Sequence, residues 1–418
     1  MPEFFLENVW EFLLFMSRVD GDLSAVSSSE QDEILELAAE LLPSNELIKN
    51  PYIRAKQVEI FFALVINDEE RMTGVFSGLD RRVHRLLIGN MMKFYVQVES
   101  LGTSTAFYDK FSIRFHLTKV LLKILSFDSS GGFSLKELEK SLDDSIFVRF
   151  INLCVSDATY LLDESLSKLA EIREKQMQTT PPLTAEEQKL LSQTERQCQS
   201  LLSLGSESLT FLAKLTAAIP SAFVRPEILD RLTAMLNFNL VLLAGPRCSK
   251  LKVNNPGKYN FNPRALLSSL IEIYLSFLGN ESFIRSVAGD ERSFSPQLFE
   301  NCVGIMKRTG MSLDMIESFT KLSEKIMIFG KESGEARTGE ELNAENIPEE
   351  YLDPILFNLM VDPVRLPASH MIVDRSTIQA HLLNDPHDPF NRQPLSIEEV
   401  EPMTELKNEI ENFIKSQK

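Results

Sequence analysis

The pattern of apolar residues changes near residue 330, and this change divides the chain into two parts. Over residues 1–330, apolar residues recur every three to four positions along most of the sequence, which is the period of an amphipathic helix. From about residue 350, short apolar runs alternate with prolines and aspartates, which are typical of tight turns. The sequence therefore predicts a large helical body followed by a small module of mixed helix and strand.

The predicted helices of the body follow one another with short connections. Thr184 and Glu187 have the spacing of a capping box, which marks the start of one of these helices. A further helix begins at Asn50-Pro51. We expect the others near residues 82–99, 106–126, 135–176, 184–219, 226–244, 263–278, 296–307 and 311–329.

The apolar stripes of these helices predict how they pack. In the first helix, Phe5, Val9, Phe12, Leu13 and Met16 lie along one stripe. Because one such helix cannot bury its stripe alone, a succession of them predicts a solenoid of stacked helices. We expect armadillo-like stacking, although no fixed repeat period is visible in the sequence.

The module after the body begins with a proline-bounded loop and continues as a predicted hairpin. Two short apolar runs, residues 364–366 and 371–373, suit paired strands. Asp374 precedes residues 375–383, which have one apolar face, and it is the expected N-cap of a helix. A second proline loop at residues 388–394 leads to a final amphipathic helix, with inner residues Leu406, Ile410, Phe413 and Ile414.

Five short motifs occur in the module in an order that resembles one known domain. They are Leu-Asp-Pro-Ile at 352–355, Asp-Pro-Val at 362–364, Val-Asp-Arg-Ser-Thr-Ile at 373–378, His-Leu-Leu at 381–383 and Asp-Pro-Phe-Asn-Arg at 388–392. Together they closely resemble a U-box, the zinc-free relative of the RING domain.

The cysteines and histidines agree with a zinc-free module. All four cysteines lie upstream of it, so the module has no thiolates for zinc. The spacing of His370, His381 and His387 matches no familiar zinc pattern. We therefore expect no metal ion and no cofactor.

The body resembles one particular U-box family, the ubiquitin chain-elongation factors of the Ufd-two type. Similar stretches lie at residues 50–56, 107–111, 235–240, 245–248 with 251–253, and 290–295. The expected domains are a helical core at 1–330, an acidic hinge at 331–346 with glycines and a run of glutamates, and the U-box at 347–418. The resemblance begins well inside the family's core, so we expect a form shortened at its N-terminal side.

The resemblance implies a RING-type ubiquitin transferase that forms no covalent intermediate with ubiquitin. Such a ligase binds a conjugating enzyme already charged with ubiquitin and positions the thioester for attack by a lysine of a pre-ubiquitinated substrate. Arg392 matches the linchpin position, where a guanidinium can donate to carbonyls of both partners. The implied recruiting surface consists of Ile355, Leu356, Leu383, Pro389 and Phe390.

The same residues also have structural interpretations. Arg392 could instead hold its own loop in place, and Ile355 and Leu356 could be part of the module's core. In a U-box, polar side chains take over the zinc ions' role of holding the two loops. Our candidates for this structural network are Ser369, Asp374, Arg375, Asp388 and Asn391.

Charge and cysteine content restrict the partners and the compartment. A net charge of -17 argues against a nucleic-acid surface, which needs clustered lysine and arginine. No apolar run approaches the eighteen or so residues that span a bilayer. Four scattered cysteines suit the reducing cytosol or nucleus. The resemblance implies a proteasome-linked AAA ATPase of the valosin-containing type as a further partner, and the lack of a sustained heptad pattern predicts a monomer.

Two other functions remain open from the sequence. One is a non-catalytic scaffold whose U-box only docks a partner. The other is a ligase with a covalent ubiquitin intermediate, which needs an activated thiolate. Cys248, beside Arg247 and Lys250, is the electrostatically plausible nucleophile, whereas Cys154 has an apolar helical context.

Overall fold

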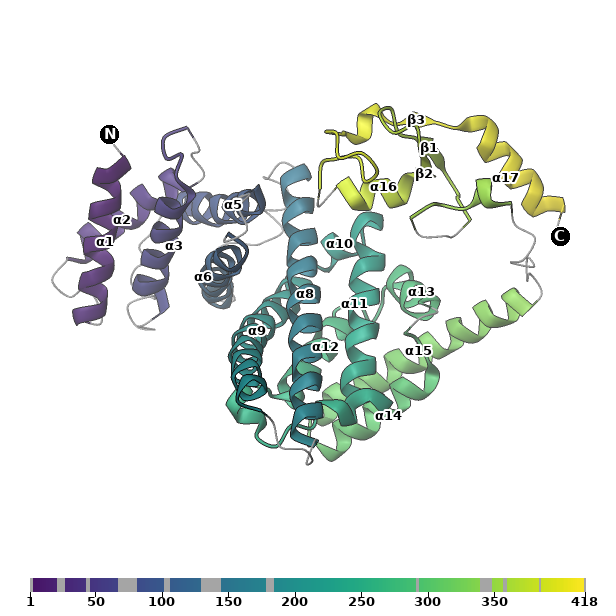
Figure 1. Ribbon diagram of the computed structural model, residues 1–418, viewed down its shortest axis with the longest axis horizontal. Coiled ribbons are helices and arrows are strands. Elements are labelled where there is room, and N and C mark those ends of the chain that lie inside the picture. The colour runs from purple at the N-terminus through teal and green to yellow at the C-terminus, as the bar shows by residue number, and fades with distance from the viewer. Residues whose placement is uncertain are drawn as a thin grey trace. The chain divides into compact units, whose positions relative to one another are not determined.

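The chain divides into two compact units, whose elements are labelled in Figure 1. The first comprises Met1–Ile219 and Lys250–Ser269, and the second comprises Pro220–Ser249 and Leu270–Lys418. The structure is a computed structural model, and it describes residues 3–20, 27–42, 46–66, 81–100, 106–128, 144–177, 184–290, 293–338, 348–355, 359–382 and 385–416.

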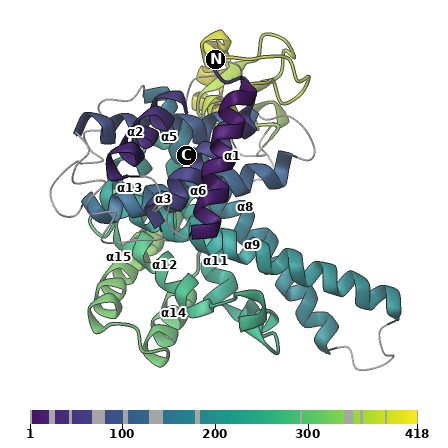
Figure 2. The same ribbon diagram turned by 90° about the vertical axis from the view of Figure 1, so that its left-hand side faces the viewer.

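The helices of the first unit pack in two rows. One row contains α1 (Glu3–Asp20), α3 (Pro51–Ile66), α6 (Ala106–Asp128) and α9 (Ala185–Ala218), and each packs against the next. The other contains α2 (Ser28–Leu41), α5 (Arg81–Gln97) and α8 (Asp144–Met177) in the same relation. The long helices α8 and α9 join the rows and run side by side, as Figure 2 shows. This stacking confirms the helical body, while its armadillo-like geometry stays a prediction.

The expected helix starts are supported by caps. Thr184 accepts a hydrogen bond from the backbone of Glu187, whose side chain accepts one from the backbone of Thr184, so the predicted capping box of α9 is confirmed. Ser27 and Glu30 form a second capping box at the start of α2. These caps satisfy amide groups that have no partner within the helix.

The first helix, α1, buries a different stripe from the one that the sequence suggests. Its buried residues are Leu6, Trp10, Leu13 and Leu14. Of the residues in the expected stripe, Leu13 is buried and Met16 half-buried, whereas Phe5, Val9 and Phe12 are exposed. The sequence could not decide between the two stripes because α1 is apolar on nearly every side.

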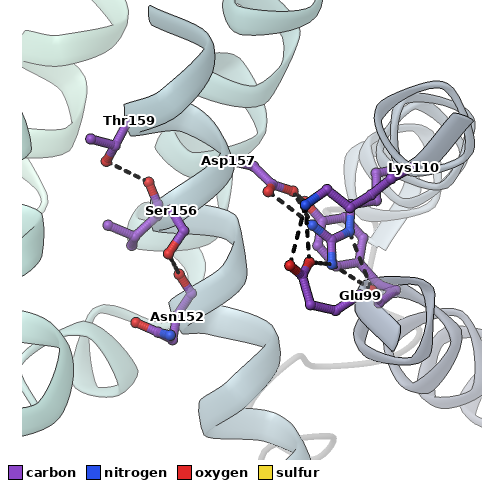
Figure 3. Close-up of polar contacts among 9 residues, drawn as sticks. Glu99, Lys110, Asn152, Ser156, Asp157 and Thr159 are labelled. Carbon is purple, nitrogen blue, oxygen red and sulfur yellow. Dashed lines mark hydrogen bonds and ion pairs between the residues drawn. The ribbon is translucent and has the colours of Figure 1, made fainter. Parts of the chain in front are cut away.

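A buried ion-pair network joins α5, α6 and α8. Arg114 donates from Nη1 to both oxygens of Asp157, at 2.9 and 3.0 Å, and Tyr95 donates from its hydroxyl to Asp157 at 2.6 Å. Arg114 also pairs with Glu99, which in turn pairs with Lys110 (Figure 3). Because these side chains come from three helices and from the short turn η1 (Val98–Ser100), the network fixes the helices' relative rotation.

One helix of this unit has membrane-like composition but the burial of a core helix. By length and composition, α8 is apolar enough to cross a membrane. However, 67% of its most apolar window is buried inside the protein, where α8 packs against α5 and α9. Its apolar residues are therefore accounted for by packing within the unit.

The second half of the helical body centres on Tyr274, which is fully buried. Its ring makes edge contacts with Phe283, Phe299 and Phe319, and its hydroxyl donates to Asn237. The elements from this part of the chain are α10 (Pro220–Phe223), α11 (Pro226–Ala244), η2 (Pro246–Leu251), η3 (Pro256–Tyr259), α12 (Pro263–Leu275), α13 (Glu281–Gly289), α14 (Pro296–Arg308) and α15 (Leu313–Thr338).

Two of these helices differ from expectation. Helix α13 was not predicted from the sequence, although Asn280 caps it by accepting a hydrogen bond from the backbone of Phe283. The last helix of the body, α15, continues to Thr338 and so includes the first part of the expected hinge. The rest of the hinge, residues 339–346, lies outside the described residues.

The C-terminal module is built on a small antiparallel sheet with the order β2-β1-β3. β1 (Pro363–Arg365) pairs with β2 (Ile372–Asp374), which confirms the predicted hairpin, and with β3 (Glu401–Pro402), which the sequence analysis missed. The module also contains η5 (Glu349–Tyr351), α16 (Arg375–Leu382), η6 (Ile397–Glu399) and α17 (Thr404–Ser416), and Figure 1 shows α16 beside the strands. Its core consists of Val364, Leu366, Val373, Ile378, Leu395 and Val400.

Candidate functional site

The first loop of the module presents an apolar side chain to solvent. A bridge between Leu352 and Leu359 closes the loop. Asp353 is fully buried, and its Oδ1 accepts a hydrogen bond from the backbone of Ile355 at 2.8 Å. This contact fixes the turn at Pro354 and leaves Ile355 38% exposed. Leu356, the other expected contact residue of this loop, lies outside the described residues.

Asp374 connects the first loop, the sheet and α16. Its Oδ1 accepts from the backbone and the hydroxyl of Ser376, so the predicted N-cap is confirmed. Its Oδ2 accepts from the backbones of Val361 and Asp362, at 2.7 and 2.9 Å. Burial acts to raise the pKa of Asp374, but the hydrogen bonds from Ser376, Asp362 and Val361 outweigh it and lower the pKa.

A surface ion-pair cluster lies next to this cap. Asp362 pairs with Lys407 at 2.8 Å and with Arg375 at 2.6 Å. The hydrogen bonds from Lys407 and then Arg375 lower the pKa of Asp362. The cluster ties β1 to α16 and α17. The predicted network did not include Asp353, Asp362 and Lys407. Each of them has a partner 12 to 45 positions away, and a local sequence motif does not show such contacts.

The second loop is held by hydrogen bonds to the backbone and the side chain of Asp388. Asp388 donates its amide to Gln393 and accepts from the amide of Arg392, both at 2.8 Å. Its side chain is fully buried, and Oδ1 accepts from the backbone of Phe390 at 2.9 Å. A bridge between His387 and Pro394 closes the base of the loop. A single buried carboxylate therefore shapes the segment that carries Phe390 and Arg392.

Arg392 occupies an unusual backbone conformation at the tip of this loop. Its φ is 59°, in the left-handed region that residues other than glycine and asparagine rarely adopt. This backbone conformation costs on the order of 1 kcal/mol of conformational free energy. The side chain is exposed and makes no hydrogen bond or ion pair with the residues that the structure describes. This geometry speaks against the interpretation that the guanidinium ties down its own loop.

Both loops are attached to the same short helix. Asp353 Oδ2 accepts from the amide of Asp374, at the start of α16. In the last turn of α16, His381 donates from Nε2 to the carbonyl of His387, at the base of the second loop. An eight-residue helix is only about 12 Å long. The two attachments therefore hold Ile355 and Phe390 on loops that flank a single helix.

The exposed apolar side chains match part of the expected recruiting surface. Phe390 is 41% exposed and Pro389 is half-buried. Leu383 lies outside the described residues. Apolar side chains left exposed on a well-ordered module are typical of a contact surface for a protein partner.

The five residues of the expected structural network fall into separate groups. Asp374 and Arg375 hold the first loop and the sheet, as described above. Asp388 and Asn391 hold the second loop, where Asn391 accepts from the backbone of Gln393. The Ser369 hydroxyl is buried without a hydrogen-bond partner among the described residues, so it belongs to neither group there. Asp374 and Asp388 accept mainly from backbone amides, and no hydrogen bond among the described residues joins the two groups.

Three of the four cysteines offer little thiolate chemistry at neutral pH. Burial raises the pKa of Cys198 and of Cys302 to about 12, and it raises the pKa of Cys154 well above its usual value. Cys248 is half-buried in η2. Among the described residues, no cluster of three or more histidine, cysteine or acidic side chains could hold a metal ion.

Comparisons with known proteins point to one family. Residues 1–327 match the family model of the ubiquitin elongating factor core, and residues 347–418 match that of the U-box domain. The chain is 37% identical to the "Ubiquitin conjugation factor E4" of Schizosaccharomyces pombe, with all of this chain and 42% of that protein aligned. It is 36% identical to the "E4 ubiquitin-protein ligase UFD2" of Saccharomyces cerevisiae, where all of this chain aligns with 44% of that protein.

A plant relative gives the same result. The chain is 34% identical to the "Probable ubiquitin conjugation factor E4" of Arabidopsis thaliana, covering all of this chain and 41% of that protein. The chain thus spans about two fifths of the length of these relatives. The match over the helical body and the U-box that follows it show that this chain belongs to the ubiquitin elongating factor core family.

Proposed function

We propose that this chain is a U-box ubiquitin ligase that extends ubiquitin chains on substrates already carrying ubiquitin. The observation that carries the proposal is the outward-facing Arg392, presented by a loop that a buried aspartate shapes. Two relatives that align with the whole chain are named as a conjugation factor and as a ligase for ubiquitin. The module has exposed apolar residues for recruitment, and Arg392, which makes no ion pair with the described residues, is a cation suited to positioning.

Recruitment uses the two loops that flank α16. Ile355 and Phe390 insert into the surface of a conjugating enzyme charged with ubiquitin, and Pro389 stiffens the loop that carries Phe390 and Arg392. So small a surface suits a transient complex, because the conjugating enzyme must leave to be recharged after each transfer. The module itself forms no bond with ubiquitin.

Arg392 accelerates transfer by positioning. Its guanidinium has five N–H donors and no acceptor, so it can donate at the same time to a carbonyl of the conjugating enzyme and to one of ubiquitin. These contacts hold ubiquitin against the enzyme and leave its thioester open to an incoming lysine. Restricting the reactants in this way can lower the barrier by several kcal/mol.

Further partners follow from the resemblance to the family. We propose substrates destined for proteasomal degradation and a proteasome-linked AAA ATPase of the valosin-containing type. The four cysteines form no disulfide in the described residues, which suits a reducing compartment and supports a cytosolic and nuclear location.

The proposal can be tested in a purified mixture of activating enzyme, a panel of conjugating enzymes, ubiquitin and this chain. We expect chain formation with at least one conjugating enzyme. Ile355→Ala should lose both chain formation and binding of the conjugating enzyme, while its circular dichroism remains that of the parent. Met371→Ala is the matched control, because Met371 is 37% exposed in the same module but lies in the hairpin. Inactivity of the parent with every enzyme would favour the scaffold function.

The same assay separates this mechanism from one with a covalent intermediate. Cys248→Ala should keep full activity, because the proposed transfer needs no thiol on this chain. A ubiquitin adduct on Cys248 that is sensitive to reducing agent, together with inactivity of Cys248→Ala, would contradict the proposed mechanism.

A further inference from the structure

Lysine is missing from a long stretch of the chain that includes both recruiting loops. No lysine occurs in residues 332–406, between Lys331 and Lys407. The next longest stretches without lysine, residues 1–48 and 259–306, are about two thirds as long. The long stretch begins in the last part of α15 and continues through the sheet and α16 of the module. The part of the chain that is proposed to hold a charged conjugating enzyme therefore has no lysine side chain before Lys407.

The same stretch contains positive charge, but only as arginine. Its cations are Arg337, Arg365, Arg375 and Arg392. The contacts of two of them do not require a guanidinium. Arg375 donates one hydrogen bond to Asp362, from Nε at 2.6 Å, and an ammonium group could donate one such bond equally well. Arg365 is exposed and makes no hydrogen bond or ion pair with the residues that the structure describes. Structure alone thus does not explain why lysine is missing here.

The helical body uses lysine at its surface for comparable contacts. Lys56 of α3 pairs with Glu11 at 2.6 Å, and Lys321 of α15 pairs with Glu317 at 2.7 Å. Both ion pairs are at least partly exposed to solvent. Because the body contains such lysines, the chain does not avoid lysine in general, and the reason for its absence from residues 332–406 must be local.

The chemistry of ubiquitin transfer supplies a local reason. The unprotonated amine of a lysine attacks the thioester carbon, an amide bond forms as the carbon–sulfur bond breaks, and the proton of the amine passes to the released thiol of the conjugating enzyme. A lysine fixed on the ligase would meet the thioester at a far higher effective concentration than a substrate lysine in solution. A guanidinium does not compete, because it stays protonated at neutral pH.

The first lysine after the stretch, Lys407, is held by an ion pair. Its Nζ lies 2.8 Å from Oδ1 of Asp362, and its side chain is 40% exposed. Asp362 is ionised at neutral pH, because the hydrogen bonds from Lys407 and Arg375 lower its pKa. The ammonium group of Lys407 thus lies against a carboxylate, and a protonated amine has no lone pair with which to attack.

We propose that residues 332–407 offer no acceptor amine to the positioned thioester, so that ubiquitin passes to a lysine of an incoming protein instead of to this part of the ligase. Arginine supplies the positive charge of the stretch, and Asp362 withholds Lys407. The inference rests on the proposed function, since it concerns which amine accepts ubiquitin from the thioester that the module positions.

The test introduces lysines without changing charge. The variant Arg337→Lys with Arg365→Lys is compared with the parent, each as the complete chain, in a mixture of activating enzyme, conjugating enzyme and ubiquitin. Attachment sites are mapped by mass spectrometry of proteolytic peptides. We expect ubiquitin on residue 337 or 365 of the variant and a rise of about threefold or more in self-ubiquitination, because the new amines are local to the thioester. Discharge of the conjugating enzyme to free lysine should stay at the parent's rate.

Lys407→Arg provides the second part of the test. The parent should carry no ubiquitin on Lys407, and Lys407→Arg should leave the total self-ubiquitination unchanged. Lys407 as a main acceptor in the parent would overturn the inference. So would a lysine variant that discharges the enzyme at the parent's rate but carries no ubiquitin at 337 or 365. A parent that does not accelerate discharge to free lysine with any conjugating enzyme would instead overturn the proposed function, and the inference with it.

Discussion

Buried carboxylates have different partners in the helical body and in the C-terminal module. In the described part of the body, Asp157 accepts from two side chains, those of Arg114 and Tyr95. In the module, Asp353, Asp374 and Asp388 accept mainly from backbone amides. The cause is secondary structure: helices satisfy their own amides, whereas the loops of the module leave amides that only side chains can satisfy.

The protonation of these carboxylates differs accordingly. Burial raises the pKa of Asp157, against the opposing effect of Arg114. In the module, donated hydrogen bonds lower the pKa of Asp374, and Lys407 and Arg375 lower that of Asp362. The charge pair of the body could therefore be replaced by a pair of apolar side chains. The carboxylates of the module could not, because an apolar side chain cannot accept the hydrogen bonds of the backbone amides.

The largest expected effect is the loss of the module's fold when Asp374 is removed. Asp374→Ala leaves the amides of Val361, Asp362 and Ser376 without their acceptor, at a cost of about 3 kcal/mol or more. A module this small has only a few kcal/mol of stability. The dispersed NMR signals of the U-box should therefore collapse. Asp385→Ala, at a side chain that is 57% exposed, is the control and should leave the spectrum intact.

The body should tolerate removal of both charges better than removal of one. Asp157→Leu alone leaves Arg114 buried without its main partner. It should lower the free energy of unfolding, measured with urea, by about 3 to 5 kcal/mol. Asp157→Leu with Arg114→Met should recover most of this loss, since a well-packed apolar pair is often as stable as a buried ion pair. A double variant as unstable as the single one would mean that the body depends on its carboxylate as the module does.

A smaller effect is expected from pH. Because the folded-state pKa values of Asp362 and Asp374 lie below the unfolded value of about 3.9, their ionised forms stabilise the module above that pH. This contribution is lost as the pH falls through the folded-state values. Melting of the module followed from about pH 6 to pH 3 should show the loss, and Asp362→Asn should make the curve shallower. If the pH dependence of melting kept the same slope in Asp362→Asn, Asp362 would not contribute to it.

Local patterns in the sequence predicted the local structure well. The hairpin, the Asp374 cap and the capping box at Thr184 each depend on residues within a few positions of one another, and all are confirmed. Strand β3 was missed because two residues carry no pattern. In β2, Val373 is fully buried and Ile372 half-buried, and the sequence could not show this because three residues cannot define which side faces the core.

Long-range contacts could not be predicted in the same way. The pairing of Asp362 with Lys407 joins residues that no sequence window contains together. The left-handed backbone of Arg392 follows from hydrogen bonds around Asp388, which the motif Asp-Pro-Phe-Asn-Arg does not display. In α1, Phe5 and Phe12 were mistaken for part of the packing stripe because they are as apolar as the buried residues.

The most direct test of the account is the single-turnover discharge of ubiquitin from a charged conjugating enzyme to free lysine. Parent and Arg392→Ala are compared at saturating concentrations of this chain, with the affinity for the conjugating enzyme measured separately. The account predicts unchanged affinity and a discharge rate that falls by about tenfold or more, because only the positioning contact is lost. Equal discharge rates for parent and variant would contradict the role assigned to Arg392 and with it the proposed mechanism.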